Sequence, residues 1–197
     1  MADSAQRPLR ADARRNRDKI LAAAVRVFAE EGLDAHLEHI AKEAGVGSAT
    51  LYRNFATREA LIEAVYRNEV AQLCDAVPDL LDEKPPCEAL RAWTRLFLDY
   101  VTAKFGMADA LRAIAAAGSN PYGHSRDMIQ AAITALMDAC AAAGTIRTDI
   151  TPTDMGAALE GIALTSPGPE HRDRAERLLD LTLDGLKARS SSASTAG

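Results

Sequence analysis

The sequence lacks the features that mark several large classes of protein. No apolar run approaches the roughly 18 residues that a membrane-spanning helix needs, and the residues after Met1 are polar and rich in arginine. The three cysteines, Cys74, Cys87 and Cys140, are odd in number and far apart, so they form no metal or redox motif. We therefore expect a cytoplasmic protein with reduced thiols.

The sequence motifs of enzymes are missing as well. The chain has no phosphate-binding loop, no dinucleotide fingerprint and no nucleophile–base pair. His36 and His39 lie three residues apart, which could suit a metal ion, but a solvated helix start is the more common reason for such a pair. No stretch alternates apolar and polar residues as a strand does. These absences predict an all-α protein without enzymatic activity, metal or cofactor.

Charge is distributed unevenly along the 197 residues. The net charge is −5, but residues 1–67 carry 11 Lys/Arg against 10 Asp/Glu, whereas residues 68–197 carry 12 against 18. The basic excess is greatest in residues 1–19, which include Arg14. Such an excess is the electrostatic footprint of phosphate contact, although a solvated chain end would look the same. We expect residues 1–12 to be a disordered basic arm.

Residues 40–61 carry the clearest motif. Apolar spacing predicts a short helix that ends near Ala44, after which Gly45 is free to take the positive φ of a sharp turn. A second short helix is expected from Ser48 to about Asn54, and Thr57 caps a longer third helix. This arrangement predicts a helix-turn-helix, whose second helix enters the major groove of DNA.

The second helix of the motif presents two different faces. Leu51 and Phe55 lie four residues apart and are expected to be buried. The residues then expected to face outward are Ser48, Ala49, Tyr52 and Arg53, with Thr50 and Asn54 flanking them. Short side chains at the start of such a helix allow close approach to base edges. In the outward set, Arg53 can read guanine, and Asn54 can read adenine or bind phosphate.

The rest of the chain predicts further helices, for a total of about nine. The long helix after Thr57 is expected to end before Pro78, and Thr151-Pro152 opens a later helix. The last helix, over about 170–188, is apolar on more than one face, so it needs two partners. This pattern predicts a dimer interface, with a fully intramolecular helix as the alternative. The expected interface residues are Met155, Leu159, Ile162, Leu178, Leu179, Leu183 and Leu186.

Many ordered positions from Ile20 to about Tyr66 resemble the N-terminal module of the TetR family of bacterial regulators. The matching residues are Ala23-Ala24, Phe28, Gly32, Ile40-Ala41, Ala44-Gly45-Val46, Thr50-Leu51-Tyr52, Phe55 and Thr57-Arg58-Glu59-Ala60-Leu61. The resemblance implies a sequence-specific transcriptional regulator, most often a repressor, that binds a palindromic operator as a homodimer. It also implies a helix-turn-helix domain over residues 13–57 and an effector-binding and dimerisation domain over 58–189. Residues 190–197 are rich in Ser, Ala and Gly, and their composition predicts a disordered tail.

The resemblance also assigns roles to single residues. The tyrosine at position 52 is expected to donate to a phosphate, unless it packs on its own domain. Arg58 is expected to reach the DNA backbone, with a surface ion pair to Glu59 or Glu63 as the alternative. The full set of expected DNA-contacting residues is Arg14, Gly47, Ser48, Ala49, Thr50, Tyr52, Arg53, Asn54 and Arg58.

Regulators of this family typically release DNA when a small molecule occupies the second domain. Aromatic and methionine side chains suit an adaptable apolar site, although ordinary core packing uses the same residue types. The expected pocket residues are Trp93, Phe97, Tyr100, Phe105, Met107, Tyr122, Met128, Leu136 and Met137. A different function for the same sequence is a helical protein-binding adaptor that keeps the helix-turn-helix as a scaffold.

Overall fold

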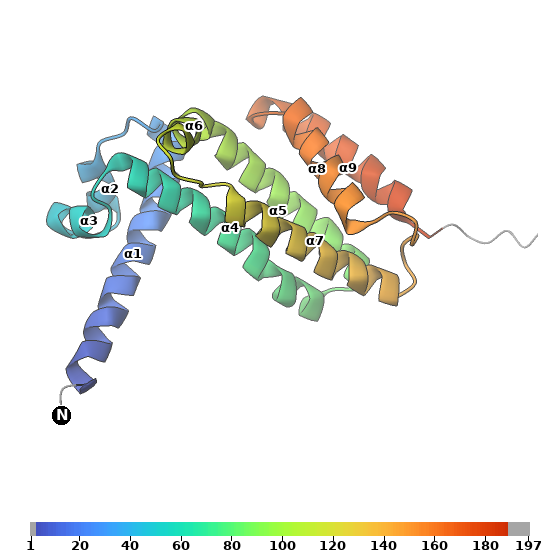
Figure 1. The fold of residues 1–197 in the computed structure, drawn as a ribbon, viewed down its shortest axis with the longest axis horizontal. Helices are drawn as coiled ribbons and strands as arrows, with labels where there is room; N and C mark the ends of the chain where they lie inside the picture. The colour runs from blue at the N-terminus through green and yellow to red at the C-terminus, as the bar shows by residue number, and fades with distance from the viewer. Residues whose placement is uncertain (1–2, 189–197) are drawn as a thin grey trace, which may run out of the picture. The chain divides into compact units, whose positions relative to one another are not determined.

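The structure is a computed structural model that describes the backbone of residues 3–188 and the side chains of residues 12–188. Over this range the chain is all-α, as expected, with nine α-helices and one 3₁₀ turn (Figure 1). The elements are α1 (Asp3–Glu31), α2 (Leu37–Glu43), α3 (Ser48–Asn54), α4 (Arg58–Glu83), α5 (Pro86–Gly106), α6 (Ala108–Ala116), α7 (Gly123–Ala142), α8 (Pro152–Thr165), η1 (Pro169–His171) and α9 (Arg172–Leu186).

The helices form two compact units. The head unit contains the residues up to Glu69 together with Gly106–Tyr122, and the body unit contains Val70–Phe105 and the residues from Gly123 onward. The division falls inside α4, so one continuous helix contributes to both units. The expected boundary lies between residues 57 and 58, whereas the first turns of α4 belong to the head unit.

The head unit is built on α1, which contacts both α2 and α3. Ile20 and Ala24 are fully buried on α1, and Ile40 is fully buried on α2. Helix α1 begins at Asp3, within the stretch 1–12 that is expected from the sequence to be a disordered arm. Alanine, leucine and arginine in this stretch favour a helix, and extending an existing helix adds one hydrogen bond for each residue fixed. Residues 1–2 and 189–197 lie outside the described range.

Helix α4 is longer than the sequence predicts. Its start is capped as expected, since Thr57 Oγ1 accepts from the Ala60 amide at 3.1 Å. The helix then continues through Pro78 to Glu83, and the Lys84 amide still donates to Leu80 O at 3.1 Å. A proline removes one amide donor from a helix. Here the helix continues because Leu73 and Val77, on the preceding turn, are buried in the body unit.

The body unit has an aromatic core on α5. Trp93 is fully buried and its indole N–H donates to Leu73 O at 2.9 Å, while the Phe97 ring stacks on it with a centroid distance of 5.9 Å. Helix α8 packs against both α7 and α9 (Figure 1). Its start has a complete capping box, in which Thr151 and Asp154 satisfy each other's backbone amides. Among residues 3–188, no helix combines the length and apolar character that crossing a bilayer demands.

Candidate nucleic-acid interface

Helix α3 is held by two side chains that face the interior of the head unit. Leu51 is 1% exposed and Phe55 is 2% exposed, as their spacing predicts. The guanidinium of Arg17 on α1 lies 4.5 Å from the centroid of the Phe55 ring, a cation–π contact. These contacts fix the rotation of α3 about its own axis, and with it the residues that face solvent.

The turn before α3 depends on glycine. Gly45 has φ +65°, where residues with a Cβ are strained, and its conformation lets the Val46 amide return to Ala41 O at 2.9 Å. Gly47 is the N-cap of α3 in ordinary extended backbone, and its carbonyl accepts from the Thr50 amide at 2.8 Å. The helix-turn-helix geometry expected from the sequence is therefore present.

The outward face of α3 matches the expected pattern of exposure. Ser48, Ala49, Tyr52 and Arg53 are exposed, while Thr50 and Asn54 are half-buried at its edges. Arg53 Nη2 donates to Thr50 Oγ1 at 3.0 Å, and Asn54 Nδ2 donates to Thr50 O at 2.8 Å. Each side chain is thus held within α3 by one hydrogen bond, and each keeps further donors for a base.

Tyr52 has a partner that sequence reasoning missed. Its hydroxyl donates to Glu38 Oε1 on α2 at 3.1 Å, although 43% of the tyrosine remains exposed. The pKa of Glu38 lies below its usual value because its own backbone amide and then the Tyr52 hydroxyl donate to the carboxylate. The same hydrogen bond raises the pKa of Tyr52. No periodic pattern could reveal a pair that lies 14 residues apart on two helices.

Arg58 is placed differently from the expectation. Its Nη1 donates to Leu33 O at 2.5 Å and to Ala35 O at 2.7 Å, so it ties the start of α4 to the α1–α2 connection. The side chain is partly buried, and among the described residues it forms no ion pair with Glu59 or Glu63. Its contact with the DNA backbone stays a prediction. Carbonyl oxygens in a tight connection need hydrogen-bond donors, and a long cationic side chain supplies them. Arg58 therefore lies against the connection instead of extending into solvent.

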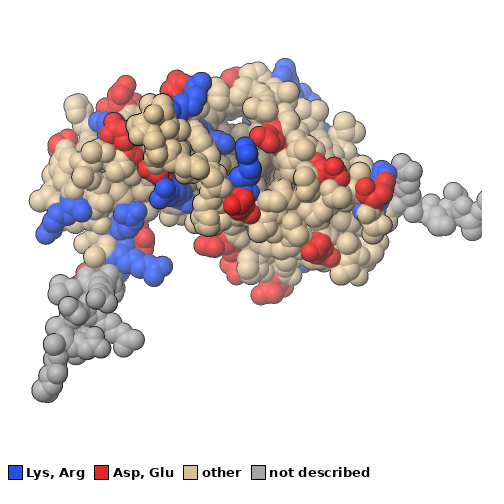
Figure 2. Space-filling model, viewed as in Figure 1, with Lys and Arg blue, Asp and Glu red and all other residues tan. Residues whose placement is uncertain are grey.

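The basic side chains of the head unit are densest on α1, whereas α3 carries one, Arg53. Figure 2 shows Lys and Arg side chains gathered on the described start of α1 and beside α3. Arg14 is exposed on α1, as a phosphate contact requires, and the neighbouring Arg15 is paired with Asp12. The interface thus combines an exposed recognition helix with nearby positive charge, which is the combination that DNA binding uses.

His39 and Cys140 both have structural surroundings. His39 Nδ1 lies 2.7 Å from Glu31 Oε1, and its Nε2 lies 3.7 Å from Glu43 Oε1, which links the end of α1 to α2. Burial raises the pKa of the Cys140 thiol to about 12, so it is a poor nucleophile. Within residues 3–188, no group of three or more His, Cys, Asp or Glu side chains is placed to hold a metal ion.

The expected ligand-binding residues divide between the two units. Met107 and Tyr122 belong to the head unit, where the Tyr122 ring packs edge-on against Tyr66 with a centroid distance of 5.8 Å. Phe105 is 49% exposed. In the body unit, Met128 is half-buried. The remaining members are buried in the core of the body unit: Trp93, Phe97, Tyr100, Leu136 and Met137. Burial suits both a packed core and an enclosed ligand site, so the ligand-binding role of these five stays a prediction.

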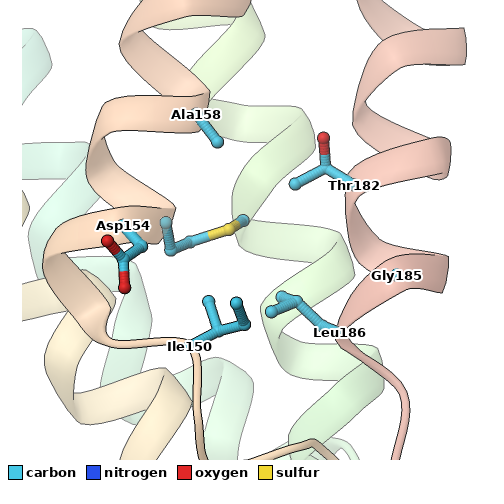
Figure 3. Close-up of a pocket in the computed structure, with 7 residues that line it drawn as sticks. Ile150, Asp154, Ala158, Thr182, Gly185 and Leu186 are labelled. Atoms are coloured by element: carbon cyan, nitrogen blue, oxygen red, sulfur yellow. The ribbon is translucent and has the colours of Figure 1, made fainter.

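A cavity of about 220 Å³ lies elsewhere in the body unit, between α8 and α9 (Figure 3). Its lining residues are Ile150, Asp154, Met155, Ala158, Thr182, Gly185 and Leu186. None of them is among the expected ligand-binding residues. Met155 and Leu186 were instead expected at a dimer interface.

The expected dimer residues are mostly part of the protomer's own core. Six of the seven are buried: Met155, Leu159, Ile162, Leu179, Leu183 and Leu186. Leu178 is half-buried. The large apolar side chains that α8 and α9 do expose are Leu164, at 74%, and Leu181, at 70%. Helical spacing identifies an apolar face but does not tell which apolar face meets the same chain and which meets another.

Comparison with protein families agrees with this architecture. Residues 20–65 match the model of bacterial regulatory proteins of the tetR family, and residues 85–188 match the C-terminal domain of SbtR-like transcriptional regulators. Together these models include the helix-turn-helix and most of the body unit. The chain belongs to the TetR family.

Solved structures of TetR regulators extend the match along the chain. A TetR transcriptional regulator from Streptomyces coelicolor is 75% identical, with a TM-score of 0.81, over 88% of this chain and 99% of that one. A TetR transcription regulatory protein from Mycobacterium vanbaalenii is 33% identical, with a TM-score of 0.74, over 91% of this chain and 99% of that one.

Curated relatives match over a shorter stretch. An uncharacterized helix-turn-helix regulator of Bacillus subtilis is 39% identical over 61 residues, which is 30% of this chain and 31% of that protein. A regulator of Staphylococcus aureus is 38% identical over 63 residues, which is 32% of this chain and 34% of that protein. The chain thus matches about a third of the length of these relatives, whereas it matches the two solved TetR regulators almost end to end.

Proposed function

We propose that this TetR-family chain is a transcriptional repressor of the bacterial cytoplasm that binds a palindromic operator with α3. The observation that carries the proposal is the outward face of α3. Ser48, Ala49, Tyr52 and Arg53 are exposed on a helix whose opposite side is locked by Leu51 and Phe55. A helix-turn-helix used only as a scaffold would have no need for such a face beside a basic α1, which disfavours the adaptor alternative.

The test is a footprint of the purified protein on the DNA beside its own gene, since regulators of this kind often control their own promoters. We expect two protected half-sites about one helical turn apart, related by two-fold symmetry. Loss of protection in a Ser48→Glu variant, which adds a negative charge at the start of α3, would support contact through this helix. Binding without any preferred fragment of the genome would contradict the proposal.

We further propose that the repressor is a homodimer formed through the exposed sides of α8 and α9. Leu164 and Leu181 are large apolar side chains with most of their surface in solvent, one on each helix. Gly161 and Gly185 are also exposed on these two helices and would allow close approach. Two such helix pairs would form a four-helix bundle. The proposed interface thus replaces most of the residues expected from the sequence with their exposed neighbours.

The effector is proposed to be a small molecule that binds in the body unit and lowers the affinity of the protein for DNA. Support comes from family membership, and the chemistry of the ligand is open. A ligand acts in this way only if it binds the DNA-free state more tightly. A thermal-shift screen with hydrophobic and cationic metabolites, followed by DNA-release assays of each hit, tests the proposal. A ligand that stabilises the protein but leaves its affinity for DNA unchanged is not the effector.

A further inference from the structure

One contact on the outward face of α3 has no part in the DNA recognition proposed above. Tyr52 donates its hydroxyl proton to Glu38 Oε1 at 3.1 Å, across the turn between α3 and α2. Glu38 is exposed in the first turn of α2. The pair therefore lies at the surface that the operator would approach, rather than in the core.

The chemistry of the two groups makes this contact exclusive. A phenol carries a single hydroxyl proton, so it donates one hydrogen bond at a time. A phosphate diester offers only acceptors. While Tyr52 donates to Glu38, it has no proton left for a phosphate, and the contact with DNA requires the contact with Glu38 to break.

The carboxylate is also a charge that DNA must approach. Its own backbone amide and the Tyr52 hydroxyl lower the pKa of Glu38, and His36 and Arg58 add smaller favourable interactions with the charge. The side chain is therefore ionised near neutral pH. A negative charge beside the expected path of a phosphate repels that phosphate, and the repulsion is greatest at low salt.

We propose that Glu38 is a competing acceptor that holds Tyr52 away from the DNA backbone and so limits the affinity for DNA of any sequence. This inference rests on the proposed function. Glu38 acts through Tyr52, so it is a positioning residue and makes no contact with a base. It is a residue that lowers affinity, and removing it is expected to tighten binding.

The experiment is a double-mutant cycle on Glu38 and Tyr52. The full-length wild type, Glu38→Ala, Tyr52→Phe and the double variant are titrated against a mixed-sequence duplex of about 30 base pairs, long enough for two half-sites. Glu38→Ala is expected to bind about fivefold more tightly, because a charge-assisted hydrogen bond to phosphate becomes available. Adding Tyr52→Phe is expected to remove most of this gain, whereas Tyr52→Phe alone changes affinity little.

Two further variants separate the hydrogen bond from the charge. Glu38→Gln keeps an acceptor for Tyr52 and removes the charge, so it is expected to gain less than Glu38→Ala. Glu59→Gln makes the same change of charge at an exposed glutamate in the first turn of α4. Its effect is expected to be the same with Tyr52 and with Tyr52→Phe. Thermal unfolding checks that each variant is folded, and a damaged fold would not tighten binding.

The outcomes distinguish this inference from the proposed function. If the wild type binds no duplex DNA, the proposed function fails and the inference fails with it. If the wild type binds but Glu38→Ala binds equally or more weakly, the inference alone is wrong. It is also wrong if Glu38→Ala gains the same factor when Tyr52 is replaced by Phe.

Discussion

Two arginines near α3 show how the contacts of a side chain, rather than its charge, assign its role. Arg53 is exposed and pairs with Thr50 on its own helix. Arg58 is partly buried and supplies donors to two carbonyls of the α1–α2 connection, which lie 25 and 23 residues earlier in the chain. We expect the first to serve recognition and the second to serve the fold.

This difference can be measured with matched substitutions. Arg58→Ala is expected to lower the free energy of unfolding by about 1–3 kcal/mol, because Leu33 O and Ala35 O both lose a donor. Arg53→Ala is expected to change stability by less than about 0.5 kcal/mol, while it weakens binding at a guanine by about 1–3 kcal/mol. Urea unfolding and DNA titration check the two quantities. Should Arg58→Ala leave stability intact but reduce the salt slope of binding by about one, Arg58 contacts phosphate after all.

Contacts of this kind also mark the limit of sequence reasoning. The burial of Leu51 and Phe55 follows from helical spacing, and the cap at Thr57 follows from local chemistry, so both could be predicted. The partners of Arg58 and Tyr52 depend on how separate helices pack, and a single sequence carries no periodic signal for that.

At the scale of the element, the turn between α2 and α3 contains two glycines whose backbone conformations differ. Gly45 has φ +65°, and Gly47 has φ −72°. An added Cβ would meet no heavy atom within 4 Å at either position, so space does not distinguish them. Backbone conformation does, because positive φ strains any residue with a Cβ.

Substitutions at the two glycines are therefore expected to change the free energy of unfolding in opposite directions. Gly45→Ala is expected to cost about 1–2 kcal/mol in the free energy of unfolding. Gly47→Ser is expected to stabilise the protein by a few tenths of a kcal/mol, because serine can cap the free amides of α3. Thermal or urea unfolding of both variants checks this pair. Equal losses from the two substitutions would mean that crowding, and not φ, sets the need for glycine.

The start of α8 depends on a carboxylate and therefore on pH. Hydrogen bonds from the Thr151 hydroxyl and then from its backbone amide lower the pKa of Asp154 in the folded state. The stabilisation is present above the ordinary aspartate pKa, and it is lost as the pH falls through the lowered pKa.

Replacing this carboxylate is expected to remove that part of the pH dependence. Asp154→Asn should lower stability at neutral pH and should lose less stability than the wild type on acidification. Urea unfolding at a series of pH values measures both effects. If the wild type and the variant follow parallel pH profiles, Asp154 makes no pH-dependent contribution.

At the scale of the whole molecule, the question is which residues of α8 and α9 face a second copy of the chain. The sequence indicates that the last helix is apolar on more than one face. It led to the wrong residues for the outer side, because Leu179, Leu183 and their neighbours fill the protomer's own core. The large apolar side chains left in solvent are Leu164 and Leu181. Any self-association through these helices must use the exposed set.

A charge placed on that surface tests the assembly. Leu181→Glu is expected to convert a dimer to a monomer, because the pairing of two copies would bury an unpaired carboxylate. The fold should be unaffected, since residue 181 is 70% exposed. Leu96→Glu on α5 is the matched control, because Leu96 is also exposed, at 40%, and lies outside α8 and α9. Sedimentation equilibrium gives the masses, and a Leu181→Glu dimer would exclude this surface.

The placement of α3 has a consequence for how such a protein diversifies. The seven residues of α3 lie between the fixed turn at Gly45 and the start of α4, which Arg58 ties to the α1–α2 connection. Only Leu51 within α3 is needed by the interior. Substitutions at Ser48, Ala49 and Arg53 can therefore give the protein a new target sequence while its scaffold stays unaltered. In the laboratory, the same seven-residue window is where a library for retargeting should be built.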